Sequence, residues 1–284
     1  MQQQILAHLG PVARVGTQLT YLPSCSSTND LLKAMAEAGA ADGTVLVAGE
    51  QTRGKGRLGR SFTSAAGKGI YLSALLRPSL PPEALLPLTG FTAEAMGRAL
   101  KRAVGAKTGI KWVNDLLLNG KKICGILTES AFGAGGRLQY VVVGVGLNVN
   151  YDMADFPEEL RSLAGSLKTE LGRAFDLAAL AAAMIEALDE LYAALLTGDA
   201  APYLAAYRQH CLTLRRDVLL VQNGASTPAH ALDVDEALGL RVRYPDGREA
   251  LVRSGEASVR GLTGYADREQ CPGVLSASAP GHAV

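Results

Sequence analysis

The chain has 284 residues, of which 48% are hydrophobic and 19% are charged, and its formal net charge is +1. This composition is that of a globular protein, long enough for one large domain and one small one. The low net charge argues against a general nucleic-acid binder, because such proteins carry an excess of basic residues.

The cysteines and the chain start bear on the cellular compartment. Cys25, Cys124, Cys211 and Cys271 form no CxxC pair, which favours reduced thiols, and the histidines form no zinc motif. The first residues, MQQQILAHLG, lack the cationic start and apolar core of a secretory signal. No apolar run approaches the about 20 residues that span a bilayer. We therefore expect a cytoplasmic protein without membrane contact.

Helices and strands are mixed in the first part of the chain. In chain order we predict a helix over 24–39, a strand over 44–52 that runs into a basic loop, a strand over 69–78, and a helix over 83–104. Ser27 or Thr28 can cap the first helix. Pro87 and Gly90 weaken the pattern of the second.

The second half begins with a hairpin and ends in short strands. We predict a hairpin over 115–129, a strand over 140–150, helices over 175–195 and 200–212, and short strands after 213. Asn119-Gly120 is a dipeptide favoured in type I′ turns, because both positions need positive φ. The hairpin favours an α+β fold with a central mixed sheet and flanking helices, followed by a small antiparallel barrel or sandwich.

The stretch RGKGRLGR (53–60) places four cations among three glycines. Gly54, Gly56 and Gly59 allow backbone N–H groups to approach an anion, which Lys55 and Arg57 can neutralise. No Walker GK[ST] follows it, and the context of a dinucleotide fingerprint is absent. A solvated turn or a nucleic-acid patch explains the composition equally well.

The stretch KWVND (111–115) joins a lysine to the chain's only tryptophan. Lys111 could hold a phosphate or a developing oxyanion, and Asp115 could hold magnesium or orient the lysine. Taken alone, the motif favours the structural alternative. In that alternative, Trp112 lies in the core and the two charged residues form a surface ion pair.

Two weaker motifs complete the candidates. In GVGLNVN (144–150), Gly144 and Gly146 suggest close approach of a ligand to a strand end, or simply a tight strand exit. Asn148 adds both donor and acceptor capacity. In SSTND (26–30), a helix N-terminus can receive a carbonyl or carboxylate, or can simply be capped.

Together and in this order, the motifs resemble those of the biotin–protein ligases. The segments are STN (27–29), EQTRGKGRLGR (50–60), KWVNDLLLNGKKICGILTE (111–129) and GVGLNVN (144–150), followed by the small β module. The resemblance covers about residues 17–262. It implies a class II synthetase-like mixed sheet and an SH3-like barrel. The expected division is an extension (1–16), a catalytic domain (17–212), the barrel (213–265) and a disordered tail (266–284).

The resemblance also implies an activity. The family forms biotinyl-5′-AMP from biotin and Mg-ATP and then transfers biotin to one lysine of the biotin carboxyl carrier protein domain of acetyl-CoA carboxylase or a related carboxylase. It implies neither specific nucleic acid nor membrane as a partner. Sheet edges in this family often pair, which allows a homodimer.

Site residues carry over motif by motif. The resemblance implies that biotin contacts Ser27, Thr28, Asn29, Gln51, Gly54, Lys55, Gly56, Arg57, Lys111 and Gly125. It implies that ATP or the adenylate contacts Arg57, Arg60, Phe62, Lys111, Asn114, Asn148 and Arg260. The catalytic charges are then Lys55, Arg57 and Lys111, and Asp115 is a candidate magnesium ligand.

The sequence departs from the family pattern at four positions. The family's loop reads GRGRRGR, where this chain has Lys55 and Leu58 in place of arginines. Val113 replaces the proline of KWPND, and Phe62 replaces a tryptophan that stacks on adenine. These changes keep the charges expected for catalysis but put nucleotide affinity in question.

Two other functions match parts of the sequence. A lipoate or octanoate ligase or transferase would share the fold, but the basic loop resembles that of biotin ligases. A biotin-sensing DNA-binding regulator would need an N-terminal helix-turn-helix, and the about sixteen residues before the catalytic region are too few for one.

Overall fold

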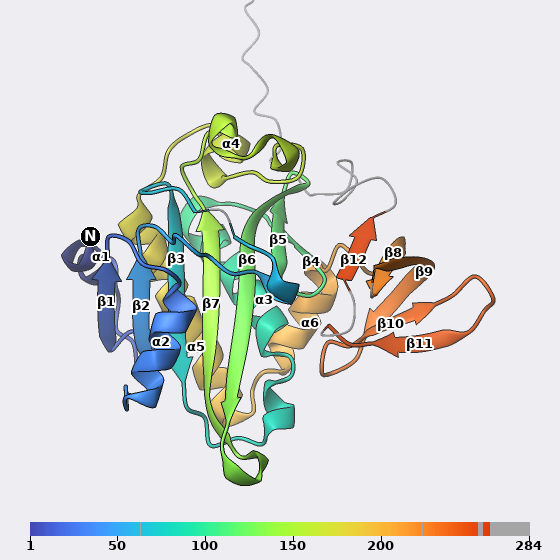
Figure 1. The fold of residues 1–284 in the computed structure, drawn as a ribbon, viewed down its shortest axis with the longest axis horizontal. Coiled ribbons are helices and arrows are strands. Elements are labelled where there is room, and N and C mark those ends of the chain that lie inside the picture. Colours follow the sequence, from blue (N-terminus) through green and yellow to red (C-terminus); the bar gives the residue numbers. More distant parts are fainter. Residues whose placement is uncertain (63, 223, 255–257, 262–284) are drawn as a thin grey trace, which may run out of the picture.

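The computed structural model describes residues 1–62, 64–222, 224–254 and 258–261. Its centre is a seven-stranded sheet in the order β1-β2-β3-β7-β6-β5-β4 (Figure 1). The strands are β1 (Gln18–Leu22), β2 (Thr44–Ala48), β3 (Gly69–Leu76), β4 (Gly109–Lys111), β5 (Asp115–Leu118), β6 (Lys121–Phe132) and β7 (Leu138–Asn148). β1 and β2 run parallel, whereas the other neighbouring pairs are antiparallel, so the predicted mixed sheet is confirmed.

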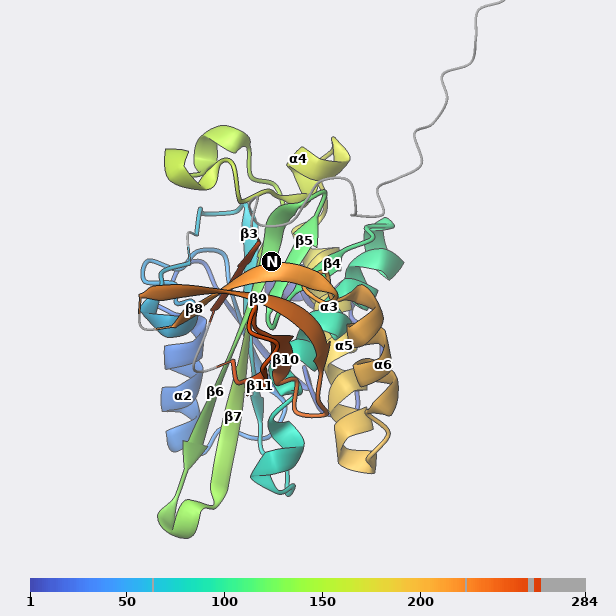
Figure 2. The same cartoon turned by 90° about the vertical axis from the view of Figure 1, so that its right-hand side faces the viewer.

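Helices cover both faces of this sheet (Figures 1 and 2). α3 (Leu88–Val104) and α5 (Leu177–Thr197) pack on one face and on each other, and α2 (Thr28–Glu37) packs on the opposite face. α1 (Gln2–His8) contacts α5, α6 (Ala201–His210) contacts α3, and α4 (Leu167–Leu171) follows the last strand of the sheet. In the part of the chain described, no helix is both long and apolar enough to cross a membrane.

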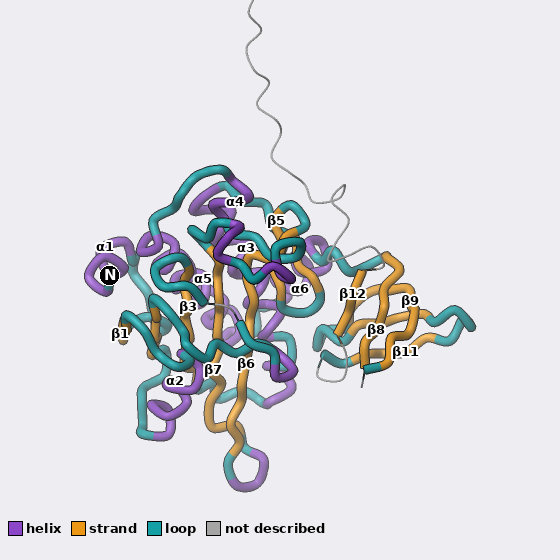
Figure 3. Tube along the Cα trace, turned by 45° about the horizontal axis from the view of Figure 1, so that its top comes forward, coloured by secondary structure: helices purple, strands orange, loops and turns teal. Residues whose placement is uncertain are grey.

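A second, smaller sheet follows the helices (Figure 3). Its strands are β8 (Arg216–Gln222), β9 (Ala225–Val234), β10 (Leu240–Arg243), β11 (Glu249–Val252) and β12 (Ser258–Gly261), in the order β11-β10-β9-β8-β12. All pairs are antiparallel, which is consistent with the predicted SH3-like domain. The buried indole Nε1 of Trp112 donates to the carbonyl of Leu238 at 2.8 Å and ties this sheet to the large one. The predicted tail of residues 266–284 lies outside the described residues.

The predicted hairpin is present as β5 and β6. Its turn residues Asn119 and Gly120 have φ values of 49° and 78°, the positive values that a type I′ turn requires. β6 then continues through the centre of the sheet beside β7.

Two predicted elements differ at their ends. The strand over 44–52 ends at Ala48, because its partner β1 stops before Pro23 and the chain leaves the sheet toward the basic loop. The helix over 83–104 is divided into a short 3₁₀ turn (Pro82–Leu85) and α3, which begins after Pro87. Proline lacks the N–H that a continuous helix would need there.

Three elements at the two ends of the large sheet were not predicted: α1, β1 and α4. They are short, so their sequences show little periodicity. In α1 the side chain of Ile5 is fully buried. The carboxylate of Asp189 on α5 accepts the backbone N–H groups of residues 13, 14 and 15, so the predicted extension (1–16) contacts the large domain.

We expect Thr92→Val to stabilise the fold by about 1 kcal/mol. Thr92 on α3 is fully buried, and its hydroxyl has no hydrogen-bond partner among the described residues. Burying an unsatisfied hydroxyl costs roughly 1–3 kcal/mol, and valine has nearly the same shape. Urea denaturation measures the free energy of unfolding. Thr89→Val is the control, because the Thr89 hydroxyl is hydrogen-bonded to that of Thr128 and its loss should destabilise the fold. A lower free energy of unfolding for Thr92→Val than for the unsubstituted protein would contradict the expectation.

Candidate active site

The pocket lies on the α2 side of the sheet, where two neighbouring strands carry glycine. Gly125 of β6 pairs with Gly146 of β7, and Gly144 follows on the same face. A Cβ on Gly144 would lie 2.1 Å from Asn29 Oδ1, and one on Gly146 would lie 2.8 Å from the Phe62 ring. The glycines therefore let these two side chains lie directly against the sheet, around an open hollow whose empty space, solvent at its mouth included, is about 480 Å³.

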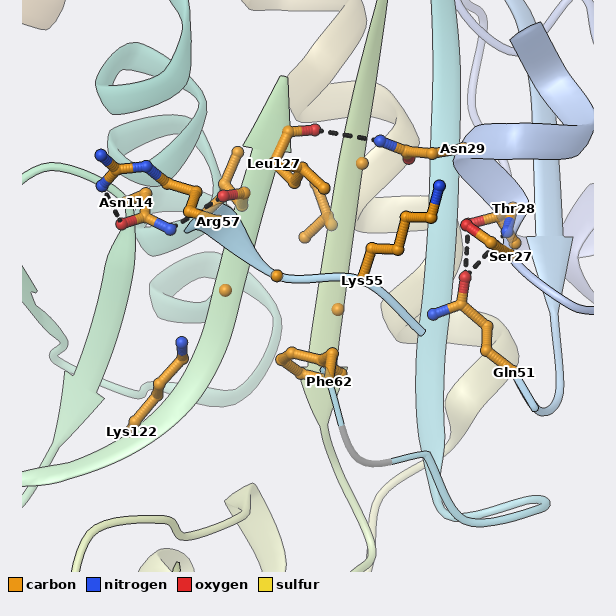
Figure 4. A pocket seen from close by; sticks show the side chains of 16 residues that line it. Ser27, Thr28, Asn29, Gln51, Lys55, Arg57, Phe62, Asn114, Lys122 and Leu127 are labelled. Carbon is orange, nitrogen blue, oxygen red and sulfur yellow. Dashed lines mark hydrogen bonds between the residues drawn. The ribbon is translucent and has the colours of Figure 1, made fainter. Parts of the chain in front are cut away.

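The pocket is lined by residues from the start of α2, the loop after β2, the hairpin and β7 (Figure 4). The lining consists of Ser27, Thr28, Asn29, Gln51, Lys55, Gly56, Arg57, Phe62, Asn114, Lys122, Gly125, Ile126, Leu127, Gly144, Val145 and Gly146. The stretch of β6 and β7 that carries Gly125, Gly144 and Gly146 is called the bare strands below. In Figure 4, Arg57, Asn114 and Lys122 lie on one side of it, and Thr28, Asn29 and Gln51 lie on the other. The pocket thus has a cationic end and a neutral polar end.

At the neutral end, the start of α2 orients an amide. Ser27 is the N-cap, and its hydroxyl accepts the N–H of Asp30. The backbone N–H and hydroxyl of Thr28 donate to Gln51 Oε1 at 2.8 and 3.0 Å. Because its oxygen is used in this way, Gln51 turns its Nε2 donor toward the pocket (Figure 4).

A buried network holds Asn29 in place beside Thr28. The hydroxyl of Ser73, which is fully buried on β3, lies 2.6 Å from Asn29 Oδ1 and 2.7 Å from Thr28 Oγ1. Asn29 Nδ2 donates to Glu129 Oε2 at 2.8 Å and to the carbonyl of Leu127 at 3.3 Å. The carboxylate can only accept, so the Asn29 amide has one orientation. Internal bonds thus hold the neutral end in one arrangement.

At the cationic end, Arg57 bridges three parts of the chain. Its guanidinium donates to Asn114 Oδ1 at 3.0 Å and also to the carbonyl of Ser254 in the small sheet's region. Asn114 in turn donates to the carbonyl of Ile126 at 2.9 Å. Burial lowers the pKa of Arg57, which Asp115 partly offsets. An arginine nevertheless stays charged at neutral pH.

Lys122 is the second cation at this end, and sequence reasoning missed it. Its Nζ lies 2.7 Å from Asp115 Oδ1 and 5.9 Å from the centroid of the Phe62 ring. Strand alternation would place Lys122 and Gly125 on opposite faces. However, the register of β5 and β6 skips Ile123, and this bulge turns Lys122 toward the pocket. The two consecutive lysines of KKICG (121–125), directly after the turn, were the available sequence signal for a cation here.

The structure brings together ten of the predicted residues. Ser27, Thr28, Asn29, Gln51, Lys55, Gly56, Arg57, Phe62, Asn114 and Gly125 all line the pocket. Phe62 lies edge-on to Tyr71 and covers the bare strands. That Phe62 replaces a stacking tryptophan stays a prediction.

Of the other predicted residues, Gly54, Arg60, Lys111, Asp115 and Asn148 lie outside this lining. Gly54 is at the base of the loop, where its carbonyl accepts the N–H of Phe62 at 2.9 Å. Arg60 is exposed, and Lys111 ends β4. Asn148 Nδ2 donates to the carbonyl of Gly165 at 3.0 Å, which is a contact within the fold. Arg260 belongs to β12, but its side chain lies outside the described part of the chain.

Asp115 was the candidate metal ligand, and its carboxylate is paired with Lys122. Among the described residues, no group of three or more His, Cys, Asp or Glu side chains could hold a metal ion. A magnesium site usually needs one or two carboxylates plus oxygens from the substrate. The residues at Asp115 therefore do not form a metal site by themselves.

Comparisons with known proteins identify the family. Residues 21–148 match the biotin/lipoate A/B protein ligase family. The bifunctional ligase/repressor BirA of Bacillus spizizenii is 33% identical over 82% of this chain and 71% of its own length. The biotin–[acetyl-CoA-carboxylase] ligase of Mycobacterium tuberculosis is 36% identical over 84% of this chain and 88% of its own.

A solved structure extends the comparison. The biotin protein ligase from Aquifex aeolicus in complex with biotin and ATP has a TM-score of 0.72 and 27% identity, and the match covers 86% of this chain and 99% of that one. The chain belongs to the biotin/lipoate A/B protein ligase family. Within it, the Mycobacterium tuberculosis and Aquifex aeolicus proteins are named as biotin ligases, the group that the sequence resembles.

We expect Gly144→Ala to destabilise the fold by about 1–3 kcal/mol, the usual cost of overpacking. The new Cβ would lie 2.1 Å from Asn29 Oδ1, and the network through Ser73 and Glu129 prevents Asn29 from moving away. Urea denaturation measures the effect. Gly56→Ala, also in the pocket lining, meets its nearest neighbour at an ordinary 3.4 Å and should change stability by less than about 0.5 kcal/mol. Equal effects of the two substitutions would show that Asn29 is not held in place.

Proposed function

We propose that this protein is an ATP-dependent biotin–protein ligase that forms biotinyl-5′-AMP and transfers biotin to a lysine of a biotin carboxyl carrier protein domain. The observation that carries the proposal is the polarity of the pocket. Thr28, Asn29 and Gln51 supply a neutral polar end, and Arg57 and Lys122 supply a cationic end. Biotin has the same two ends, a neutral ureido ring and an anionic carboxylate.

The neutral end suits the ureido ring. Gln51 Nε2 can donate to the ureido carbonyl, and the unused lone pair of Asn29 Oδ1 can accept a ring N–H. The bare strands at Gly125, Gly144 and Gly146 leave room for a flat bicyclic group against the sheet. The preformed network lowers the entropy cost of binding, since the polar groups are already oriented.

The cationic end suits the first chemical step. A biotin carboxylate oxygen attacks the α-phosphorus of ATP, the bond to the bridging oxygen of the β-phosphate breaks, and pyrophosphate leaves. Arg57 and Lys122 can offset the repulsion between the two anions and stabilise the charge of the transition state. The ion pair with Asp115 at 2.7 Å holds the Lys122 ammonium at this end of the pocket.

In the second step, the amine of a carrier lysine attacks the acyl carbon. The bond to AMP breaks, AMP leaves, and the amine loses a proton as the amide forms. The acyl adenylate must be kept from water in the meantime. The glycine-rich loop (residues 53–60) crosses the pocket and is placed to exclude water (Figure 4).

Magnesium would accompany ATP in this proposal. Asp115 is paired with Lys122, so the phosphates would provide most of the metal's ligands. Phe62 would lie against the nucleotide in place of the family's tryptophan. Arg60 then acts through the loop and Asn148 through the fold.

The wider assignments follow from the same proposal. Residues 17–212 form the catalytic domain and 213–265 the barrel, which contacts the loop through the bond from Arg57 to the Ser254 carbonyl. The carrier domain would belong to acetyl-CoA carboxylase or a related carboxylase in the cytoplasm. β1 is an outer strand of the sheet, and the Gln2 side chain of α1 bonds its Leu19 carbonyl and Tyr21 N–H, so a second copy that paired with β1 would have to displace Gln2.

Biotin-dependent exchange between ATP and pyrophosphate tests the proposal. We expect exchange with biotin and magnesium present and none with lipoate in its place. Exchange with lipoate alone would assign the protein to the lipoate branch of the family. A folded protein that exchanges with neither acid would overturn the proposal.

We expect Lys122→Ala to abolish exchange, with a loss of at least about 100-fold, because it removes a charge beside the reacting oxygens. Lys111→Ala is the matched control. Its side chain lies outside the pocket lining at the end of β4, so exchange should fall far less. The reverse order of effects would restore the role that the sequence suggested for Lys111.

We expect Arg57→Gly to let biotinyl-5′-AMP escape, since the loop loses its bonds to Asn114 and Ser254. Labelling of bystander lysines on an added unrelated protein should rise, as measured by streptavidin blot. Arg53→Gly, at an exposed position of the same loop, should leave the pattern unchanged. Labelling confined to the carrier in both variants would count against this role.

A further inference from the structure

The glycine-rich loop is a small hairpin that lies across the pocket. Lys55 and Ser61 pair through an isolated antiparallel β-bridge of their backbones, and the N–H of Gly56 donates to the carbonyl of Arg60 at 2.7 Å. These internal bonds shape the loop but do not attach it to either side of the pocket. On the cationic side, Arg57 attaches it to Asn114 and to the carbonyl of Ser254.

On the other side, Lys55 attaches the loop to α2. Its Nζ lies 2.7 Å from both carboxylate oxygens of Asp30. The side chains are 46% and 38% exposed, so water and salt can reach the pair. Figure 4 shows the Lys55 side chain extending toward Thr28 and Asn29, on the α2 side, and away from Arg57 and Lys122.

Asp30 is itself held in place by a chain of alternating charges. Lys33, one turn along α2, lies 3.1 Å from Asp30 and 2.6 Å from Glu129. Glu129 then accepts from Asn29 in the pocket. Burial alone would raise the pKa of Asp30, but hydrogen bonds from Lys55 and Lys33 outweigh it and lower the pKa. The carboxylate is therefore charged at neutral pH.

This geometry gives Lys55 a different role from the catalytic one that the loop motif suggests. The Lys55 ammonium is held by Asp30 on the α2 side of the pocket, away from Arg57 and Lys122. It adds little to the field at the cationic end, where Arg57 and Lys122 lie. Lysine also suits a single carboxylate partner, because it acts as a compact point charge.

We propose that Asp30 is a positioning residue that latches the glycine-rich loop over the pocket through Lys55. The inference rests on the proposed function, because what the loop retains is the adenylate. With both sides of the loop attached, opening requires the Lys55–Asp30 pair to break. Loss of the pair speeds release of the adenylate and leaves its formation intact.

The experiment measures how fast the adenylate escapes. Enzyme is incubated with radiolabelled biotin, ATP and pyrophosphatase, passed through a desalting column, and release of labelled biotinyl-5′-AMP is followed by filter binding. In Asp30→Asn we expect release about two- to five-fold faster than in the unsubstituted protein, the range for an exposed ion pair. The kcat of biotin-dependent exchange should stay the same, because Asp30 lies outside the pocket lining.

Glu190→Gln is the matched control. Glu190 on α5 forms an exposed ion pair with Arg102 at 2.8 Å, with side chains that are 50% and 52% exposed, on the opposite side of the sheet. Glu190→Gln removes one carboxylate charge, as Asp30→Asn does, but away from the loop, so the rate of adenylate release should not change. Asp30→Glu keeps the carboxylate and should restore release to within about two-fold of the unsubstituted rate.

A double-mutant cycle separates a latch from direct contact with substrate. Lys55→Met should speed release as much as Asp30→Asn does, and the double variant should be no faster than either single one. High salt should speed release from the unsubstituted protein and leave Asp30→Asn unchanged, because salt screens an exposed pair. Additive effects, or release from Asp30→Asn at the unsubstituted rate, would overturn the latch.

The first measurement also separates this inference from the proposed function. If the unsubstituted protein accumulates no labelled adenylate from biotin and ATP, the proposed function fails. If it accumulates the adenylate but Asp30→Asn releases it at the same rate, only the latch fails.

Discussion

The site depends on the absence of side chains at one place in the sheet. Where β6 and β7 meet, Gly125 pairs with Gly146, and Gly144 follows on the same face. Any larger residue at Gly144 or Gly146 would collide with Asn29 or Phe62. The hollow thus lies where these strands carry no side chains, because only glycine lets other groups touch the sheet surface. The neutral network, the aromatic cover and the loop are all arranged around this bare area.

The polarity of the pocket follows from what each side is attached to. The neutral end is built on the start of α2 and on Ser73, a fully buried hydroxyl within an otherwise apolar strand. Its polar groups bond to one another, so their burial is compensated. The cationic end is built on the hairpin and the loop, and each of its cations has a partner: Asp115 for Lys122, and Asn114 and a carbonyl for Arg57. Such pairing holds positive charge at the edge of a core without leaving it uncompensated.

The small sheet contributes through main-chain atoms. Leu238 accepts from the indole of Trp112, and Ser254 accepts from Arg57 of the loop. Trp112 is next to the hairpin that carries Asn114 and Asp115. The position of the small sheet is therefore coupled to the cationic end of the pocket, although none of its described side chains lines the pocket.

Much of the fold could be predicted because its signals are local. The Asn119-Gly120 turn, the cap at Ser27 and the apolar strand of β7 each depend on a few consecutive residues, and each is present. The short elements α1, β1 and α4 were missed because their formation depends on tertiary packing, such as the burial of Ile5 against α5.

The same division applies to the site. The sequence by itself determined the family, the α+β class and most of the pocket-lining residues, because the order and spacing of these polar residues and glycines can be recognised without the structure. Tertiary structure alone decided which lysine enters the pocket, since the bulge at Ile123 turns Lys122 inward while Lys111 ends an outer strand. It also decided that Asn148 braces Gly165 and that Lys55 faces Asp30. The physical reason is that a side chain's direction depends on strand register and on partners distant in the chain, and a motif specifies neither.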